Sequence, residues 1–194
     1  MTMESKLHLS EKIPNLIAAF TSKTRGIGYN NDLPWKRSLS MDLKWLNYLT
    51  TYKPNKVALI MGKNTFVSIR KPLSKRVNIV VSSQTFNDVV NVKSVDEALN
   101  YASQNNLIPV FFGGSRIFEE ALRKPCKVFF TVIQENDKIE SDAFFPEYNI
   151  LLDNITYEVN EILTKTNKDV NWMHENGEVR ENGYNFSFYV GINE

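Results

Sequence analysis

Six short apolar runs, separated by amphipathic segments, constrain the fold of this chain more than any other feature. The runs are rich in Ile, Val and Phe, and several are apolar at consecutive positions, which is typical of strands covered on both faces. They span residues 13–20, 56–61, 77–82, 89–92, 108–112 and 128–133. Helical spacing of apolar residues is found between them, in segments 42–50, 64–69, 95–103 and 116–122. This alternation predicts an α/β fold with a mostly parallel sheet.

The last third of the chain has a different pattern. Residues 155–159 and 184–190 alternate between apolar and polar side chains, which predicts a closing antiparallel pair of strands. Residues 164–183 between them are polar, so we expect an exposed insert whose sequence says little about function. Its two turn signals are the pairs Asn176-Gly177 and Asn182-Gly183.

Composition and charge exclude several classes of protein. The 194 residues, 42% of them hydrophobic, suit a single domain over 1–194 with a polar N-terminal extension over 1–12. The 23 basic residues nearly balance the 22 acidic ones, so we expect neither a nucleic-acid nor a membrane partner. Cys126 is the single cysteine, and His8 and His174 lack zinc-site spacing, so no disulfide or metal is expected. Without an apolar leader or membrane span, the sequence indicates a soluble, intracellular and cytoplasmic protein.

Asp42 is the strongest candidate for a catalytic group. Helical spacing places it on one stripe with Trp45, Leu46 and Leu49, so its carboxyl group should face inward. Burial disfavours the charged form and raises the pKa, which allows a carboxyl group to hold or relay a proton near neutral pH. An ordinary acidic residue that complements the helix dipole explains the position equally well.

Two strand-to-helix junctions carry glycine where a phosphate could approach the backbone. Gly113-Gly114 precedes the helical segment 115–122, and Gly62-Lys63 precedes 64–69. Amides at helix N-termini bind phosphates, and two such junctions in one sheet suggest an extended ligand with several phosphates. For a lone Gly-Gly pair, a tight turn is a better explanation than a phosphate site. Neither junction is a P-loop, and segment 26–28 lacks the third glycine of a Rossmann fingerprint.

Four further features have both a functional and a structural interpretation. Ser82-Ser83 end a strand, where hydroxyls can bind phosphate, and Arg76 can bind a carboxylate with two hydrogen bonds. Thr131 lies inside an apolar strand and could support the acid, and the loop 26–35 could close over a site. Each feature also has a purely structural explanation. Ser82-Ser83 could be a polar strand end, and Arg76 could be a surface residue. The Thr131 hydroxyl could bond to the backbone, and the loop 26–35 could be a long connection held by Trp35.

In order and spacing these pieces resemble the dihydrofolate reductase family over residues 16–190. The matching stretches are Leu16-Ile17-Ala18-Ala19, Gly26-Ile27-Gly28 through Leu33-Pro34-Trp35, Asp42, Ile60-Met61-Gly62-Lys63-Asn64-Thr65-Phe66, Pro72-Leu73, Asn78-Ile79-Val80-Val81-Ser82-Ser83, Phe112-Gly113-Gly114-Ser115 and Phe144-Phe145-Pro146. The Gly113-Gly114-Ser115 triplet and the polar insert before the last strand resemble eukaryotic, fungal-type members more than bacterial ones.

The resemblance implies a fold and a reaction. The fold would be an eight-stranded, mostly parallel sheet with an antiparallel C-terminal strand and four flanking helices. The reaction would be NADPH-dependent reduction of 7,8-dihydrofolate to 5,6,7,8-tetrahydrofolate, which supports one-carbon metabolism. Asp42 would hydrogen-bond the pterin and promote its protonation, with support from Thr131. The resemblance also implies a cis Gly113-Gly114 bond, antifolate-like small molecules as further ligands, and a monomer.

The resemblance also implies which residues contact each ligand. Those that correspond to the substrate pocket are Ile17, Ala18, Ala19, Leu33, Asp42, Leu43, Leu46, Asn47, Thr65, Ile69, Arg70, Leu73, Arg76, Phe112 and Thr131. Those that correspond to the NADPH site are Ala19, Ile27, Gly28, Asn31, Asp32, Gly62, Lys63, Asn64, Thr65, Ser82, Ser83, Gln84, Gly113, Gly114, Ser115, Arg116, Ile117 and Phe118.

The sequence departs from the family pattern at a few positions. The spacing from Trp35 to Asp42 is slightly long, Leu46 replaces a frequent Phe, and Phe118 replaces a frequent Tyr. Two alternatives remain, a different NADPH-dependent reductase acting on a pyrimidine intermediate, and a non-catalytic folate or nucleotide binding module. The first would need neither Asp42 nor Arg76, and the second would tolerate loss of the acid.

Overall fold

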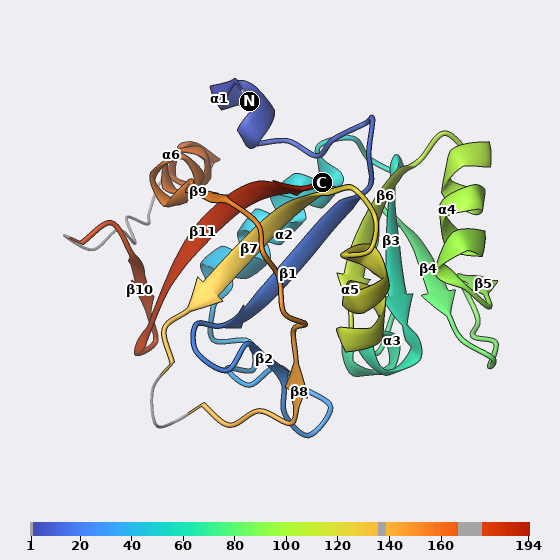
Figure 1. Ribbon diagram of the computed structural model, residues 1–194, viewed down its shortest axis with the longest axis horizontal. Coiled ribbons are helices and arrows are strands. Elements are labelled where there is room, and N and C mark those ends of the chain that lie inside the picture. The colour runs from blue at the N-terminus through green and yellow to red at the C-terminus, as the bar shows by residue number, and fades with distance from the viewer. Residues whose placement is uncertain (1, 136–138, 167–175) are drawn as a thin grey trace.

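The computed structural model describes residues 2–135, 139–166 and 176–194, which form a β-sheet with helices on both faces (Figure 1). The main path of the sheet has the strand order β10-β11-β7-β1-β6-β3-β4-β5, and β9 pairs with β11. Neighbours from β7 through β5 are parallel, whereas β11 runs antiparallel to β7, β9 and β10. The predicted α/β class, with a mostly parallel sheet and an antiparallel C-terminal strand, is confirmed.

Seven strands of the main sheet keep close to the predicted runs, whereas β9 and β10 lie outside them. Their bounds are β1 (Asn15–Thr21), β3 (Val57–Gly62), β4 (Val77–Val81), β5 (Val90–Val92), β6 (Ile108–Gly113), β7 (Cys126–Ile133), β9 (Leu152–Asn154), β10 (Val179–Glu181) and β11 (Tyr184–Asn193). A separate two-stranded sheet joins β2 (Gly26–Gly28) to β8 (Ala143–Phe144).

The helices divide between the two faces of the sheet, with α5 in front of it and α2 behind it in Figure 1. Their bounds are α1 (Met3–Lys6), α2 (Ser40–Thr51), α3 (Lys63–Ile69), α4 (Val95–Gln104), α5 (Ser115–Ala121) and α6 (Thr156–Thr166). Buried side chains of α2, α3 and α6 form one cluster, which we call the α2-side core. Those of α4 and α5 form the α5-side core.

Side-chain alternation along β1 divides the strand between the two cores. Leu16, Ala18 and Phe20 belong to the α5-side core, whereas Ile17 and Ala19 pack against the α2-side core. This is the period-two pattern of a strand covered on both faces. A functional side chain on β1 must therefore occupy an odd-numbered position to share the side of α2.

The prediction of a strand over 155–159 is wrong, because α6 begins at Thr156. The alternation in these five residues also fits a helix, since Ile155, Val159 and Leu163 recur every four residues and are buried. The Asn154 side-chain oxygen accepts the backbone N–H of Thr156 at 2.9 Å, which supports the helix start. The antiparallel neighbours of β11 are β7, β9 and β10 instead.

The predicted exposed insert over 164–183 is partly structured. It contains the end of α6 and the strand β10, which pairs with β11 through a turn at Asn182-Gly183. Both turn residues have positive φ, 51° and 84°, as a type I′ hairpin requires. Residues 167–175, with His174, lie outside the described residues, and Asn176 and Gly177 are exposed.

The polar N-terminal segment packs against the domain. Leu9 is buried in the α2-side core. The Lys127 ammonium group of β7 donates to the backbone oxygens of Ser5 and His8 at 2.5 and 2.6 Å. Lys6 forms an ion pair with Asp153 at 2.9 Å. Segment 1–12 therefore includes packed residues rather than only a solvated extension.

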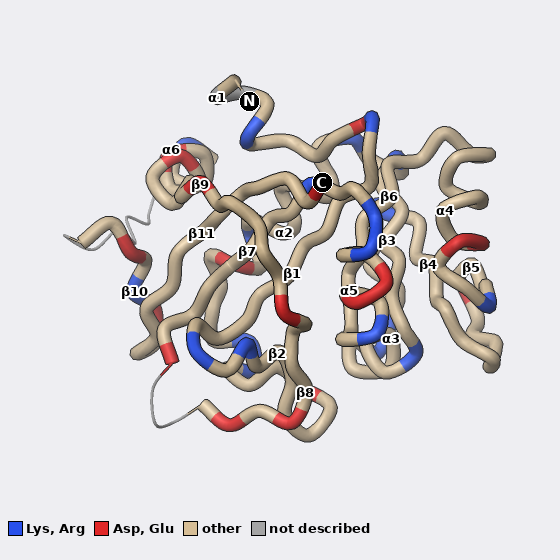
Figure 2. The backbone as a smooth tube through the Cα atoms, viewed as in Figure 1, with Lys and Arg blue, Asp and Glu red and all other residues tan. Residues whose placement is uncertain are grey.

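Charge is spread over the molecule as the balanced composition predicts, and Figure 2 shows basic and acidic residues interspersed along the backbone. Within the described ranges, no helix is both long and apolar enough to cross a membrane. The same part of the chain holds no group of three or more His, Cys, Asp or Glu side chains arranged to bind a metal ion.

Candidate active site

Asp42 lies in the first turn of α2 and hydrogen-bonds across to the central sheet. The Thr131 hydroxyl of β7 donates to Asp42 Oδ1 at 2.6 Å. Thr131 is buried, and its strand neighbours Phe129 and Ile133 belong to the α2-side core. The structure thus joins the predicted acid to the predicted supporting hydroxyl, which are 89 residues apart in sequence.

The helix stripe predicted around Asp42 is largely present. Trp45 and Leu49 are buried in the α2-side core, and Leu46 is half-buried. Some surface of Asp42 as a residue stays accessible, while its carboxyl group is enclosed by surrounding atoms. The carboxyl group is therefore shielded from bulk water, whereas other atoms of the residue reach the surface.

The surroundings of Asp42 raise its pKa from 3.8 to about 6. Burial is the largest cause, because it disfavours the charged carboxylate. The hydrogen bond from Thr131 acts in the opposite direction, and the negative charge of Glu181 raises the pKa further. About a tenth of the Asp42 carboxyl groups are therefore protonated at neutral pH, far more than at the ordinary pKa, which suits a group that moves a proton.

Glu181 is a site residue that the sequence interpretation missed. Its Oε1 accepts the backbone N–H of Ser40 at 3.0 Å, and its Oε2 accepts that of Met41 at 3.2 Å. These donors begin α2, whose N-cap residue Leu39 makes no side-chain capping bond. The Asn182-Gly183 pair could have revealed a hairpin and so the strand β10, but not which helix the hairpin meets.

Most apolar residues predicted for the substrate pocket do lie on the side of Asp42. Packed against the α2-side core and partly accessible are Ile17, Ala19, Leu33, Ile69, Leu73 and Phe112. Leu43, with 39% of its surface exposed, lies at the rim of α2. Ala18 is the exception, since its side chain belongs to the α5-side core and only its backbone is available to a ligand near Asp42.

Arg76 is held beside the second half of α2. Its Nη1 donates to Thr50 Oγ1 at 2.9 Å and to Asn47 Oδ1 at 3.4 Å, and its Nε donates to the Ser74 carbonyl at 2.8 Å. Partial burial lowers the pKa of this guanidinium from its ordinary value. Arg70, by contrast, is exposed and ends α3 in a left-handed conformation with φ of 65°. Of these two cations, Arg76 has the fixed geometry that suits a carboxylate.

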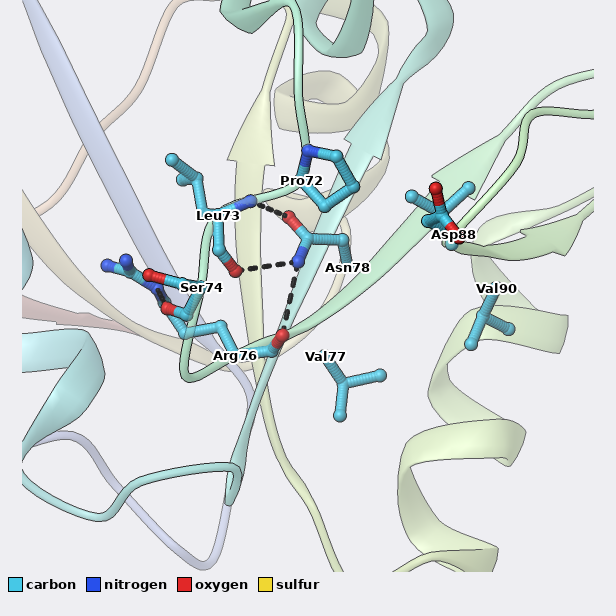
Figure 3. Close-up of a pocket in the computed structure, with 9 residues that line it drawn as sticks. Pro72, Leu73, Ser74, Arg76, Val77, Asn78, Asp88 and Val90 are labelled. Atoms are coloured by element: carbon cyan, nitrogen blue, oxygen red, sulfur yellow. Dashed lines mark hydrogen bonds between the residues drawn. The ribbon is translucent and has the colours of Figure 1, made fainter.

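A surface pocket adjoins Arg76 (Figure 3). The Asn78 amide orders the turn at its edge, since it accepts from the Leu73 N–H and donates to the Leu73 and Arg76 carbonyls at 2.9 to 3.1 Å. The Arg76 guanidinium points away from Asp88 and Val90 on the far wall. Asp42 does not line this pocket, which therefore adjoins rather than forms the candidate site.

The two glycine junctions meet at the carboxyl edge of the sheet. A Cβ built on Gly62 would lie 3.9 Å from the Gly114 nitrogen, and one on Gly114 would lie 3.4 Å from Thr65 Oγ1. Gly62 and Gly114 are the N-cap residues of α3 and α5, and neither helix has a side-chain cap. The Gly113-Gly114 bond is cis, which confirms that expectation. These neighbouring helix starts form a cradle of backbone donors that suits phosphate groups.

The remaining residues predicted for the cofactor differ in accessibility. Lys63, Asn64, Ser83, Gln84 and Arg116 are exposed, and Ser82, Thr65 and Ser115 are half-buried. Ile117 and Phe118 are buried in the α5-side core. Their side chains back the glycine junctions, since a Cβ on Gly62 would lie 3.7 Å from Ile117 Cγ1 and one on Gly113 would lie 3.0 Å from Phe118 Cζ. Ile27 packs against the same core.

The loop over 26–35 contacts the rest of the domain at both of its ends. Its first residues form β2, the Asn30 N–H donates to Asp142 at 2.9 Å, and Asn31 and Asp32 are exposed at its tip. Trp35 is 2% exposed and anchors the end of the loop in the α2-side core. Trp35 therefore holds the end of the loop, and closure of residues 26–34 over a ligand stays a prediction.

Taken together, the fold and the site define an α/β protein with two neighbouring, uncapped helix starts at one edge of its sheet and a buried carboxyl group beside an apolar, partly accessible wall. The sequence model for the family described as dihydrofolate reductase matches residues 14–175. The chain belongs to the dihydrofolate reductase family.

Several curated dihydrofolate reductases are similar to the chain. That of Haemophilus influenzae is 39% identical over 137 residues, which cover 70% of this chain and 79% of the relative. That of Buchnera aphidicola is 39% identical over 139 residues, 70% of this chain and 80% of the relative. That of Staphylococcus aureus is 38% identical over 124 residues, which cover 64% of this chain and 72% of the relative. These relatives are bacterial, so they lend no support to the expected eukaryotic, fungal type.

Proposed function

We propose that this protein reduces 7,8-dihydrofolate to 5,6,7,8-tetrahydrofolate with NADPH as the cofactor. The observation that carries the proposal is the carboxyl group of Asp42, enclosed, raised in pKa to about 6 and held at 2.6 Å by Thr131. Family membership supports the same reaction. An acid poised to be protonated near neutral pH is what the reduction of a ring imine needs.

In this proposal Asp42 is the catalytic acid of the pterin site. Its carboxyl group hydrogen-bonds the pterin ring and favours protonation of the imine nitrogen next to the carbon that is reduced. Thr131 directs Oδ1 and limits the rotation of the carboxyl group. The reduced nicotinamide, when bound, supplies the hydride.

The apolar wall and Arg76 orient the substrate. The partly accessible apolar residues beside the α2-side core would enclose the pterin and aminobenzoyl rings and exclude water from them. Arg76, already directed by Asn47 and Thr50, would bind a carboxylate of the substrate's glutamate. Dihydrofolate and antifolate-like molecules share these features, which makes both kinds of molecule proposed ligands.

The glycine cradle fits the phosphates of NADPH. Uncapped helix starts at Lys63 and Ser115 offer backbone N–H groups, and a side chain at Gly114 or Gly113 would fill the space. Lys63, Ser82 and Ser83 would bind the phosphate on the adenosine side. On the family resemblance we further propose a single catalytic domain, a monomer and a cytoplasmic location.

The test is consumption of NADPH, followed by its near-ultraviolet absorbance, with dihydrofolate as the second substrate. We expect loss of absorbance only with both substrates present, and a large fall in rate for Asp42→Asn. Asp96→Asn is the matched control, because this exposed aspartate on α4 pairs only with Lys124 and faces neither the cradle nor α2. A wild-type protein that binds NADPH but reduces no dihydrofolate would favour a binding module or another reductase.

A further inference from the structure

The first turn of α2, which carries Asp42, is held by a residue from the far end of the chain. α4 shows the usual local arrangement, in which the Ser94 hydroxyl accepts the Glu97 N–H at 3.1 Å. α2 lacks such a cap at Leu39. The Glu181 carboxylate replaces it, and Glu181 is 141 residues away from Ser40 in sequence. The start of α2 thus depends on the tertiary structure.

Three hydrogen bonds connect Glu181 to the helix. Oε1 accepts the Ser40 N–H at 3.0 Å and the Ser40 hydroxyl at 2.5 Å, and Oε2 accepts the Met41 N–H at 3.2 Å. Next to it, the Asn182 side-chain amide donates to the Ser38 carbonyl at 2.7 Å. The β10–β11 hairpin therefore binds both the last residues before α2 and its first two residues. Asp42 is the next residue along the helix.

The charge of Glu181 also acts on Asp42. From β7, Asp42 meets the neutral hydroxyl of Thr131, and from β11 the helix meets the apolar ring of Phe188, which packs on Trp45. β1 presents only the apolar Ile17 and Ala19 to this side of the sheet. On α2 itself, Lys44 follows two residues later. The negative charge of Glu181 raises the pKa of Asp42.

We propose that Glu181 is a positioning residue for the reaction, which fixes the first turn of α2, and with it Asp42, against the β10–β11 hairpin and acts on the Asp42 carboxyl group through its charge. Glu181 itself need not touch substrate or cofactor. Its two effects have different origins, since the hydrogen bonds act on geometry and the charge acts on the proton equilibrium. The catalytic part of this inference rests on the proposed function, whereas the coupling between the two carboxyl groups does not.

The direct test is the titration of Asp42 by carbon NMR of protein with labelled aspartate carboxyl groups. Glu181→Gln removes the charge and keeps one acceptor oxygen, so the midpoint of Asp42 should fall by a few tenths of a pH unit. Ser40→Ala is the matched control, because it removes a hydrogen bond to Glu181 but leaves the charge in place. Its midpoint should equal that of the wild type while its melting temperature falls. An unchanged or raised midpoint in Glu181→Gln, or an equal shift in Ser40→Ala, overturns the inference.

Glu181→Asp provides a second variant if Glu181→Gln does not fold. Aspartate keeps the negative charge on a side chain that is one methylene shorter. We therefore expect the titration midpoint of Asp42 to fall less than in Glu181→Gln. A midpoint that rises in Glu181→Asp contradicts the proposed role of the charge.

Kinetics then separates this inference from the proposed function. If the wild type reduces dihydrofolate, the pH profile of kcat for Glu181→Gln should move to lower pH, with a rate about two-fold lower near neutral pH. An unshifted profile in an active protein overturns the role of Glu181 and leaves the proposed function intact. An inactive wild type overturns the proposed function, and the NMR titration still decides the coupling.

Discussion

The Thr131 hydroxyl donates to Asp42 Oδ1 at 2.6 Å and so joins the central strand β7 to the first turn of α2. Because β7 pairs with β1 on one side and β11 on the other, Thr131 lies on an interior strand of the sheet. Asp42 is thereby fixed from the sheet side by Thr131 and from the helix start by Glu181, with opposite effects on its proton affinity.

Replacement of Thr131 by valine should shift the pH profile upward. Valine has nearly the same shape but donates no hydrogen bond, and this bond lowers the pKa of Asp42, so its loss raises that pKa. The midpoint of kcat against pH should move to higher pH, opposite to the shift for Glu181→Gln. We expect a loss of about 1 kcal/mol in the free energy of unfolding, measured by urea denaturation.

Ser187→Ala is the control for Thr131→Val. It removes a buried hydroxyl from β11, where Ser187 pairs with Val132 rather than Thr131. Its pH profile should match the wild type. If Thr131→Val leaves the profile in place, the hydroxyl does not act on Asp42.

Replacement of Asp42 by asparagine should stabilise the fold at neutral pH while it removes activity. The folded-state pKa of about 6 lies above the ordinary value of 3.8, so the carboxylate is disfavoured in the native state. Asp42 therefore lowers stability as the pH rises from 3.8 to 6, and the loss persists above pH 6. At neutral pH we expect Asp42→Asn to be more stable by about 3 kcal/mol, with no difference at pH values well below the ordinary pKa.

Urea denaturation of the wild type and Asp42→Asn at several pH values measures this difference. A variant that is less stable at neutral pH would show that the carboxylate is well accommodated. The role of burial in raising its pKa would then be wrong.

Replacement of Arg76 by leucine should weaken substrate binding more than it slows catalysis. A charge-assisted pair with a carboxylate contributes about 1.5 to 3 kcal/mol, so KM for dihydrofolate should rise at least about ten-fold, with a small change in kcat. Lys71→Met is the control, since this exposed lysine lies before the same turn and has no described hydrogen bond. Equal changes in KM for both variants would mean that general charge, and not the geometry of Arg76, attracts the substrate.

Replacement of Gly113 by alanine should impair both folding and cofactor binding. Its φ of 111° disfavours any side chain, and a Cβ would lie 3.0 Å from Phe118 Cζ. Gly177→Ala separates the two effects, because Gly177 has φ of 72° with nothing within 4 Å of an added Cβ. We expect a cost of about 1 kcal/mol for Gly177→Ala and more for Gly113→Ala, by thermal denaturation. Only Gly113→Ala should raise the Kd for NADPH in a fluorescence titration, and an unchanged Kd would remove Gly113 from the proposed cradle.

Several features of the site were predictable from short segments. The spacing of Asp42, Trp45 and Leu49 indicated an inward-facing acid, because helical periodicity acts over one or two turns. The glycine junctions were predictable for the same reason, since a strand followed by glycine and a helix is a local signal. The strand predicted over 155–159 was wrong, because five residues are too few to distinguish the period of two of a strand from the period of 3.6 of a helix.

Other features depend on which strands become neighbours. Ala18 faces away from Asp42 because its strand alternates, and the match to a family motif does not say which contacts are made by the backbone alone. Arg76 bonds to Asn47 and Thr50 only because the turn before β4 lies beside α2. Glu181 had no local signal of function, since its partners Ser40 and Met41 belong to the other end of the chain.

The sequence by itself determined the α/β class, the order of the main strands along the chain, the acid at position 42 and the two glycine junctions, because these follow from periodicity and turn chemistry over a few residues. Only the tertiary structure decided the environment of the acid. Thr131 and Glu181 reach Asp42 through the pairing of β7, β11 and β10, and the pKa of a buried carboxyl group depends on every dipole and charge that the fold places around it.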